Sequence, residues 1–373
     1  MKHKFFGDIE RLRGFACILV LIQHIAWICP LRFIHRILPY NLLDGRGAIH
    51  VFFAISGFVV TLSLKNKLNS LQGNVFLERI ISARDLVISF YRKRFFRIFP
   101  VILFVAVLMG IYLYFTEENM AWLPTLLRAP AEVFWGVYNN SVELFVSSEK
   151  IHTLGFGPFW TLAVEAQFYI CWPIVLLCCK NDNTRAIVSL SLGFAFLFIV
   201  SPVVTALYGL KYYLIYNNMS ELFLGSFLAF LYRENCSYKP SGKSTKFISL
   251  ILAMIIWFYS SSIGNNFFSN IVVSLSSIFV VALAVFADKS FNMPILGRLF
   301  DFLGSRSYSF YTVQLFLANI VVEYTNSIYF RQNSLSEYEF DLYQFGIFMV
   351  VLFIVTEFVY RFIEEPFRKF GRA

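Results

Sequence analysis

Ten long apolar stretches follow one another along the chain, and they constrain its fold more than any other feature. The hydrocarbon core of a bilayer is about 30 Å thick, so a helix that crosses it needs ~20 mostly apolar residues. The strands of an outer-membrane barrel alternate polar and apolar residues instead. We therefore predict an all-α polytopic membrane protein with about ten transmembrane helices. The predicted helices cover 13–30, 47–64, 97–115, 158–179, 186–208, 213–232, 246–263, 267–287, 305–325 and 341–361.

The amino-acid composition agrees with this fold class. Of the 373 residues, 58% are hydrophobic and only 15% are charged, whereas soluble domains average about 45–50% and about 25%. These values exclude a disordered protein, a soluble globular enzyme and a nucleic-acid-binding module. No internal repeat or Gly/Ser-rich linker divides the sequence, so we expect a single integral-membrane domain over residues 1–373. The six cysteines form no CxxC pair and indicate neither a disulfide framework nor a metal site.

The positions of lysine and arginine predict the orientation in the membrane. If the N-terminus is cytoplasmic, 25 of the 32 Lys and Arg residues fall in cytoplasmic segments, as the positive-inside rule requires. An even number of helices then makes both termini cytoplasmic. Charged residues directly precede the first apolar stretch and no cleavage site follows it, so we expect a retained helix rather than a signal peptide. The longest connections are a basic cytoplasmic loop over 65–96 and an outer loop over 116–157.

The first predicted helix carries ionisable residues, which are functional hypotheses by default inside a membrane. Arg13 and His24 are eleven residues apart, which places them within about 20° of the same helix face and roughly 16 Å apart along the axis. Glu10 lies one turn below Arg13. One face would therefore run from a charged cytoplasmic mouth to a lone histidine. The alternative is a core histidine whose ring is satisfied by a neighbouring carbonyl.

Four cations stand at the cytoplasmic base of the third predicted helix. They are Arg92, Lys93, Arg94 and Arg97, and the last two share a face at i, i+3. One interpretation is a cluster that sets topology. The other is a site for a multiply phosphorylated ligand, because guanidinium groups bind phosphate in a bidentate manner. Composition does not choose between them.

The fourth predicted helix contains a carboxylate. Glu165 lies about a turn and a half inside its outer end, and a buried carboxylate must be paired or protonated. We expect a partner for Glu165 among His24, His50 and the arginines. Glu221 and Glu357 also stand within apolar runs.

Several sequence motifs resemble those of one protein family. Arg13-x10-His24 resembles the opening motif of the acyltransferase-3 family, integral-membrane O-acyltransferases of bacterial polysaccharide modification. Many relatives also have a C-terminal extracytoplasmic hydrolase-like domain, which we expect to be absent because the chain ends soon after its last predicted helix. Further segments resemble family motifs in the same order, namely Phe52–Phe58, Tyr91–Pro100, Phe159–Pro173, Gly304–Tyr311 and Arg361–Phe367.

Three positions depart from the family pattern. The family usually has Asp where Glu10 stands, often has Asp or Glu where His50 stands, and commonly has His where Gln314 stands. Gln314 cannot act as an acid or base, so no catalytic role is assigned to it. The purpose of His50 is left open.

The resemblance implies an acyl-CoA-dependent membrane enzyme. It would transfer an acyl group, most often acetyl, from cytoplasmic acyl-CoA to a sugar hydroxyl of a cell-envelope polysaccharide such as O-antigen. Acyl-CoA would be a co-substrate, with no bound cofactor and no metal. The other partners would be the lipid bilayer of the bacterial inner membrane and a glycan acceptor, free or lipid-linked, whereas nucleic acid is not expected. The sequence leaves the oligomeric state open.

The resemblance also implies roles for the residues of the motifs. His24 would take the proton from the attacking hydroxyl, and Arg13 would bind the CoA pyrophosphate or pantetheine carbonyls. Glu165 would orient His24 or bind sugar hydroxyls. The four cations at 92–97 would bind the CoA phosphates.

Residues proposed to contact the substrate have structural alternatives. Trp160 and Tyr169 would stack on a sugar ring, but aromatic residues also form interfacial belts. Ser56 would donate a hydrogen bond to the reacting carbonyl, or would let helices approach closely. Glu10 is also predicted to contact substrate.

Other functions remain open on the sequence alone. A transporter or flippase of a lipid-linked glycan would show paired broken helices in two related halves, and no such halves are evident. An acyltransferase acting on a small molecule, a lipid or a peptidoglycan sugar is equally compatible with the motifs. The sequence also does not separate direct transfer from a covalent acyl-histidine.

Overall fold

A computed structural model gives the fold, and all regular secondary structure in the part of the chain that it describes is helical. The all-α prediction is therefore confirmed. The structure describes residues 7–28, 45, 47–69, 76–115, 123–134, 159–208, 218–233, 243–262, 267–287, 291, 296–332 and 336–372.

The chain divides into two compact units. The first comprises Met1–Ile22, Asn41–Leu86 and Cys171–Ser307, and the second comprises Gln23–Tyr40, Val87–Ile170 and Tyr308–Ala373. Four helices contribute residues to both units, namely α1, α4, α8 and, through Ser307 alone, α16. The expectation of a single membrane domain stays a prediction.

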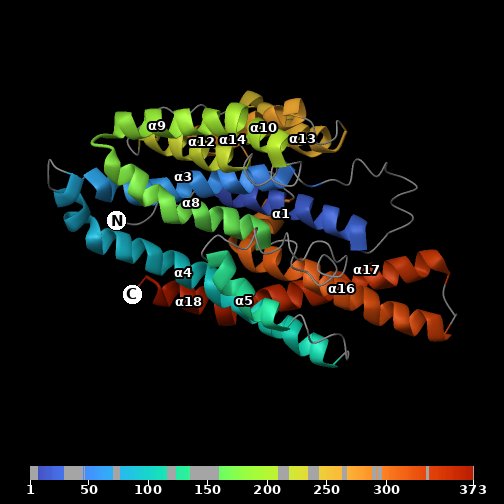
Figure 1. Cartoon of the computed structure of the whole chain (residues 1–373). Coiled ribbons are helices and arrows are strands. Elements are labelled where there is room, and N and C mark those ends of the chain that lie inside the picture. Colours follow the sequence, from blue (N-terminus) through green and yellow to red (C-terminus); the bar gives the residue numbers. More distant parts are fainter. Residues whose placement is uncertain are drawn as a thin grey trace. The chain divides into compact units, whose positions relative to one another are not determined.

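The helices follow the order drawn in Figure 1. The helices wholly or mostly in the first unit, with the shared α8, are α1 (Gly7–Ile28), α3 (Gly47–Asn69), α8 (Phe159–Cys178), α9 (Asp182–Ala195), η3 (Phe196–Val200), α10 (Ser201–Tyr208), α12 (Met219–Leu231), α13 (Lys243–Ser262), α14 (Phe267–Phe286) and α15 (Gly297–Ser305). Those of the second unit, with α8, are α4 (Phe76–Phe115), α5 (Leu123–Phe134), α16 (Ser307–Gln332), α17 (Glu337–Val359), η4 (Tyr360–Glu364) and α18 (Glu365–Phe370), where η marks a π-helical turn.

The core of the first unit forms where α12 packs against α3, α9 and α14. A Cβ atom added at Gly57 of α3 would collide with the carbonyl oxygen of Leu222, and one added at Gly225 of α12 would collide with that of Ala54. The two backbones therefore approach closely at two reciprocal positions. Small residues permit such approaches between membrane helices.

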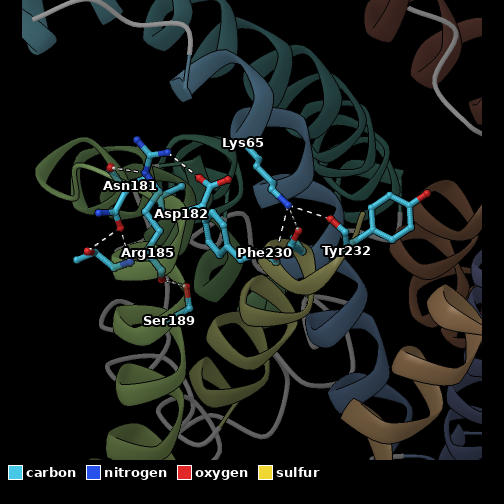
Figure 2. Close-up of polar contacts among 10 residues, drawn as sticks. Lys65, Asn181, Asp182, Arg185, Ser189, Phe230 and Tyr232 are labelled. Carbon is cyan, nitrogen blue, oxygen red and sulfur yellow. Dashed lines mark hydrogen bonds and ion pairs between the residues drawn. The ribbon is translucent and has the colours of Figure 1, made fainter. Parts of the chain in front are cut away.

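Charged side chains donate hydrogen bonds to carbonyls at helix C-termini in the first unit (Figure 2). The ammonium group of Lys65 donates to the carbonyl oxygens of Ala229, Phe230 and Tyr232 at 2.9–3.1 Å. The last carbonyls of a helix have no partner within it, so Lys65 satisfies the C-terminus of α12. The guanidinium of Arg185, which is fully buried, donates to the carbonyl of Leu176 near the end of α8 and bonds Asp182 as well.

Several helices are suited to crossing a membrane. Each of the ten predicted ranges overlaps at least one helix in the described residues, with different bounds. Within the described residues, six helical segments are long and apolar enough to span a bilayer. These segments are Gly47–Lys65, Ile81–Phe115, Phe159–Cys178, Asp182–Val204, Phe267–Phe286 and Glu339–Phe370. The number of ten spans and the cytoplasmic placement of both termini stay predictions.

The structure differs from the predicted connections. Residues 76–96, expected within a loop, form the first half of α4, which is 40 residues long. The stretch from Phe76 to Phe99 contains no glycine or proline, so nothing in it interrupts a helix that the apolar span continues. Segments expected outside the spanning helices also form α5 and α15.

Candidate active site

The second unit gathers four of the predicted site residues between α4 and α8. Tyr169 donates a hydrogen bond of 2.9 Å to Oε2 of Glu165. The Arg94 guanidinium lies 5.1 Å from the centre of the Tyr169 ring and 5.3 Å from that of Phe90, which is cation–π range. Glu165 and Tyr169 are spaced i, i+4 on α8, and Phe90 and Arg94 are spaced i, i+4 on α4, so each pair lies on one helix face. Tyr169 thus binds both the carboxylate and the cation.

Arg97 extends this group one turn along α4. It lies near enough to interact electrostatically with the side chains of Glu165, Tyr169, Glu364 and Tyr308. The arginines were among the expected partners of Glu165, and Arg97 is close to it. We call Arg94, Arg97, Glu165 and Tyr169 the arginine cluster.

Two further helices, η4 and α16, contribute residues near Arg97, and the sequence had not assigned either to the site. Oε2 of Glu364 accepts hydrogen bonds from the backbone N–H of Ser309, at 3.2 Å, and from its hydroxyl, at 2.5 Å. An anion is favourable there because Ser309 lies in the first turn of α16, where backbone N–H groups are unpaired. Tyr308 donates a hydrogen bond of 2.8 Å to the carbonyl oxygen of Ile98 on α4.

Sequence reasoning gave Glu364, Tyr308 and Ser309 no role. All three lie inside the motifs quoted for the family resemblance, so the signal was present. What the sequence did not reveal is that Glu364 ends a π-helical turn, Tyr360–Glu364, and is only 4% exposed. The wider turn changes which side chains face inward, and π-turns occur frequently at functional sites.

The remaining cations of α4 lie apart from Arg94. Arg92 is exposed, because a step of two residues turns a helix by about 200°. Lys93 is half-buried. Their predicted role in phosphate binding stays a prediction.

Helix α1 carries two predicted catalytic residues, Arg13 and His24, and Glu10, which was predicted to contact substrate. Glu10 and Arg13 form an ion pair of 3.5 Å, as their spacing indicates. A Cβ at Gly14 would collide with the backbone of Phe300, and one at Gly304 would collide with that of Glu10, so α1 lies directly against α15. Both contacts hold the base of α1 in the first unit.

His24 lies further along the continuous helix α1 and is half-buried. Its Nδ1 atom is buried and has no hydrogen-bond partner among the residues that the structure describes. A carbonyl that would fix the ring through Nδ1 is therefore not found there. A neutral imidazole keeps one nitrogen able to accept a proton.

The residues predicted to contact substrate divide between the units. Ser56 is buried in α3, next to Gly57, and belongs to the first unit with Arg13 and Glu10. Trp160 is half-buried in the first turn of α8 and belongs to the second unit, as do the arginine cluster and His24.

A second polar cluster lies in the first unit, and we call it the histidine cluster. Nδ1 of His50 lies 2.8 Å from Oε1 of Glu221, and the hydroxyl of Ser274 donates to the same oxygen. The three residues come from α3, α12 and α14. His50 is 6% exposed, and Glu221 and Ser274 are fully buried. The described residues contain no group of three or more His, Cys, Asp or Glu side chains that could hold a metal ion.

The fold and the site define a helical, multi-pass membrane protein with a charged cluster inside one of its units. Residues 6–360 match the family model described as "Acyltransferase domain". The chain therefore belongs to the acyltransferase-3 family.

The curated relatives carry related names. O-acetyltransferase OatA of Staphylococcus aureus (strain NCTC 8325 / PS 47) is 26% identical over 99% of this chain. Putative O-acetyltransferase SACOL0978 of Staphylococcus aureus (strain COL) is 23% identical over 99% of this chain. The chain spans 58% of the length of these two relatives. No solved structure matches the chain.

Proposed function

We propose that the protein transfers an acetyl group from acyl-CoA, on the cytoplasmic side of a bacterial inner membrane, to a sugar hydroxyl of a cell-envelope polysaccharide such as O-antigen. The observation that carries this proposal is the arginine cluster, in which Tyr169 bonds the Glu165 carboxylate and lies under the Arg94 guanidinium, with Arg97 within electrostatic range of both. Membership of the acyltransferase family and the names of the relatives support it. Ten spans with both termini cytoplasmic belong to the same proposal.

The arginines suit the acyl donor. CoA carries three phosphates, and guanidinium groups bind phosphate oxygens through paired N–H donors. Tyr169 lies beneath the Arg94 guanidinium and restricts its orientation, which lowers the entropy lost on binding. Exposed Arg92 and half-buried Lys93 add positive charge along the same segment. In this proposal Arg13 binds the pyrophosphate or the pantetheine carbonyls.

The chemistry is assigned to His24. Its neutral ring takes the proton of the sugar hydroxyl while the sugar oxygen forms a bond to the thioester carbon. The carbon–sulfur bond then breaks, and the departing thiolate receives the proton from the imidazolium. Glu165 orients His24 or binds sugar hydroxyls, while Trp160 and Ser56 contact the acceptor and the acyl carbonyl.

A purified sample tests the function. The protein in lipid vesicles is incubated with acetyl-CoA, with and without glycan extracted from the cell envelope. Release of free CoA thiol is followed, and mass spectrometry detects acetylated sugars. We expect thiol release that depends on the glycan and matches the acetyl gained. Glycan movement across the vesicle membrane without thiol release would instead identify a transporter.

A further inference from the structure

Gln314 of α16 is a buried side chain whose polar groups are unused. The residue is fully buried, and neither Oε1 nor Nε2 has a hydrogen-bond partner among the described residues. Burying an amide without hydrogen-bond partners is unfavourable, because the amide loses its hydrogen bonds to water. Buried polar groups are nearly always hydrogen-bonded, so an exception needs a physical reason.

Another glutamine of the second unit shows that the fold can satisfy such a group. Gln344 of α17 is only 3% exposed. Its Nε2 donates to Oγ1 of Thr325 at 2.7 Å and to Oδ1 of Asn326 at 3.4 Å. The second unit can therefore supply partners for a buried glutamine, and the lack of them at Gln314 is specific to that position.

The position continues the candidate active site along α16. Tyr311 precedes Gln314 by three residues and so neighbours it on the helix surface. The hydroxyl of Tyr311 lies 3.0 Å from Oγ1 of Thr161 on α8. Thr161 is one turn from Glu165, and Tyr308, one turn before Tyr311, interacts with Arg97 and Glu165. The amide thus stands one helical turn beyond polar contacts that connect α8 with α16.

We propose that Gln314 binds a group of one of the two substrates that both donates and accepts a hydrogen bond, either a hydroxyl or a secondary amide. Oε1 accepts a hydrogen bond from this group and Nε2 donates one to it. The inference rests on the proposed acyl transfer. The acceptor sugar supplies such groups as hydroxyls or an acetamido group, and the donor supplies them as the two amides of pantetheine.

The burial of the amide also indicates how the substrate group reaches Gln314. No solvent reaches the side chain in this structure, so the substrate group contacts Gln314 only when neighbouring side chains separate. Their closure around the bound group excludes water, which strengthens the hydrogen bonds and prevents hydrolysis of the thioester. Gln314 contacts the substrate directly, but its amide does not transfer a proton.

A packing role makes the opposite prediction about one substitution. Methionine has a similar size and shape but no polar groups that require partners. If Gln314 only fills space, Gln314→Met removes an unfavourable burial and leaves transfer intact. If it binds substrate, the same variant unfolds at an equal or higher temperature but transfers more slowly, the trade-off expected of a functional site.

The experiment compares wild type, Gln314→Met, Gln314→Leu and the control Gln344→Met, in vesicles with acetyl-CoA and glycan. Thermal unfolding and transfer kinetics are measured for each. We expect both Gln314 variants to keep or raise the unfolding temperature and to lose kcat/KM by at least about tenfold, because a hydrogen-bonded pair is lost. Gln344→Met should instead unfold at a lower temperature and keep kcat/KM per folded molecule.

The kinetic constants identify the source of the bound group. A higher KM for acetyl-CoA alone indicates a pantetheine amide, and a higher KM for glycan alone indicates the acceptor. If both Gln314 variants are stable and transfer acetyl at the wild-type rate, the assignment of Gln314 is wrong. The proposed function would still stand. If wild type itself transferred nothing, the proposed function would fall, and this assignment with it.

Discussion

The arginine cluster and the histidine cluster are both charged groups inside helical units, yet they differ in the residues that they pair and in their exposure to solvent. The histidine cluster pairs one imidazole with one carboxylate, and Glu221 and Ser274 are inaccessible to solvent. Arg94, Arg97 and Glu165 of the arginine cluster are half-buried and remain reachable. A buried pair fixes helices against each other, whereas a reaction needs charged groups that a substrate can contact. Burial of charge alone therefore does not identify an active site.

Of the two clusters, the arginine cluster should show the larger effect on activity. Glu165→Gln keeps an oxygen that accepts from Tyr169 but removes the negative charge beside Arg97. We expect kcat to fall about a hundredfold, the scale for loss of one electrostatic contact to a transition state. The unfolding temperature should change by only a few degrees. Kinetics at equal protein and thermal unfolding measure both, and an unchanged kcat would remove Glu165 from the site.

The histidine cluster should show the reverse pattern. Glu221→Leu leaves the buried His50 and Ser274 without their acceptor, and breaking a buried pair lowers the free energy of unfolding by about 3 kcal/mol or more. Activity per folded molecule should stay within about twofold, because no substrate contact is lost.

The double variant His50→Leu with Glu221→Leu is the control for this prediction. Apolar replacement of both partners should restore part of the lost stability. A stable Glu221→Leu protein without transfer activity would contradict the contrast between the two clusters and make the histidine cluster part of the reaction.

A smaller effect is expected from Arg94→Lys. Lysine keeps the charge but loses the planar guanidinium that lies over Tyr169 and binds phosphate through two donors. The KM for acetyl-CoA should rise about tenfold with kcat nearly unchanged, in line with loss of a charge-assisted hydrogen bond. Arg361→Lys, at an arginine with a side chain 66% exposed, is the control. Should only the KM for glycan change, Arg94 belongs to the acceptor site.

The smallest expected effect concerns a helix end. Lys65→Met removes the donors that bind three carbonyls at the end of α12. The free energy of unfolding should fall by about 1 kcal/mol, since water replaces part of these hydrogen bonds. Lys67→Met on the exposed face of α3 should change it by less than about 0.5 kcal/mol. Equal effects of both substitutions would show that Lys65 does not stabilise this helix end.

Local sequence patterns predicted the parts of this molecule that depend on neighbours along the chain. Apolar runs located the helices, and the i, i+3 spacing placed Glu10 one turn below Arg13, where the structure shows an ion pair. The same runs suggested that α4 begins near Arg97, because charged residues before it resembled a loop. The helix begins at Phe76 instead, since helix formation tolerates charge where no glycine or proline interrupts it.

Contacts between distant residues were beyond sequence reasoning. His50 and Glu221 are separated by 171 residues, and only the packing of α3 on α12 brings them together. Glu364 reaches Ser309 because a π-helical turn changes its direction. Glu165 was expected to have a partner, but the hydrogen bond to Tyr169 on its own helix was not anticipated. A short motif does not specify such geometry.

The central claim is that His24 accepts the proton from the attacking hydroxyl during acetyl transfer. The direct measurement compares wild type and His24→Ala in vesicles, following labelled acetyl from acetyl-CoA into the glycan at equal amounts of folded protein. The account predicts a loss of at least about a hundredfold for the variant, the contribution typical of a general base. Transfer by His24→Ala close to the wild-type rate would contradict it.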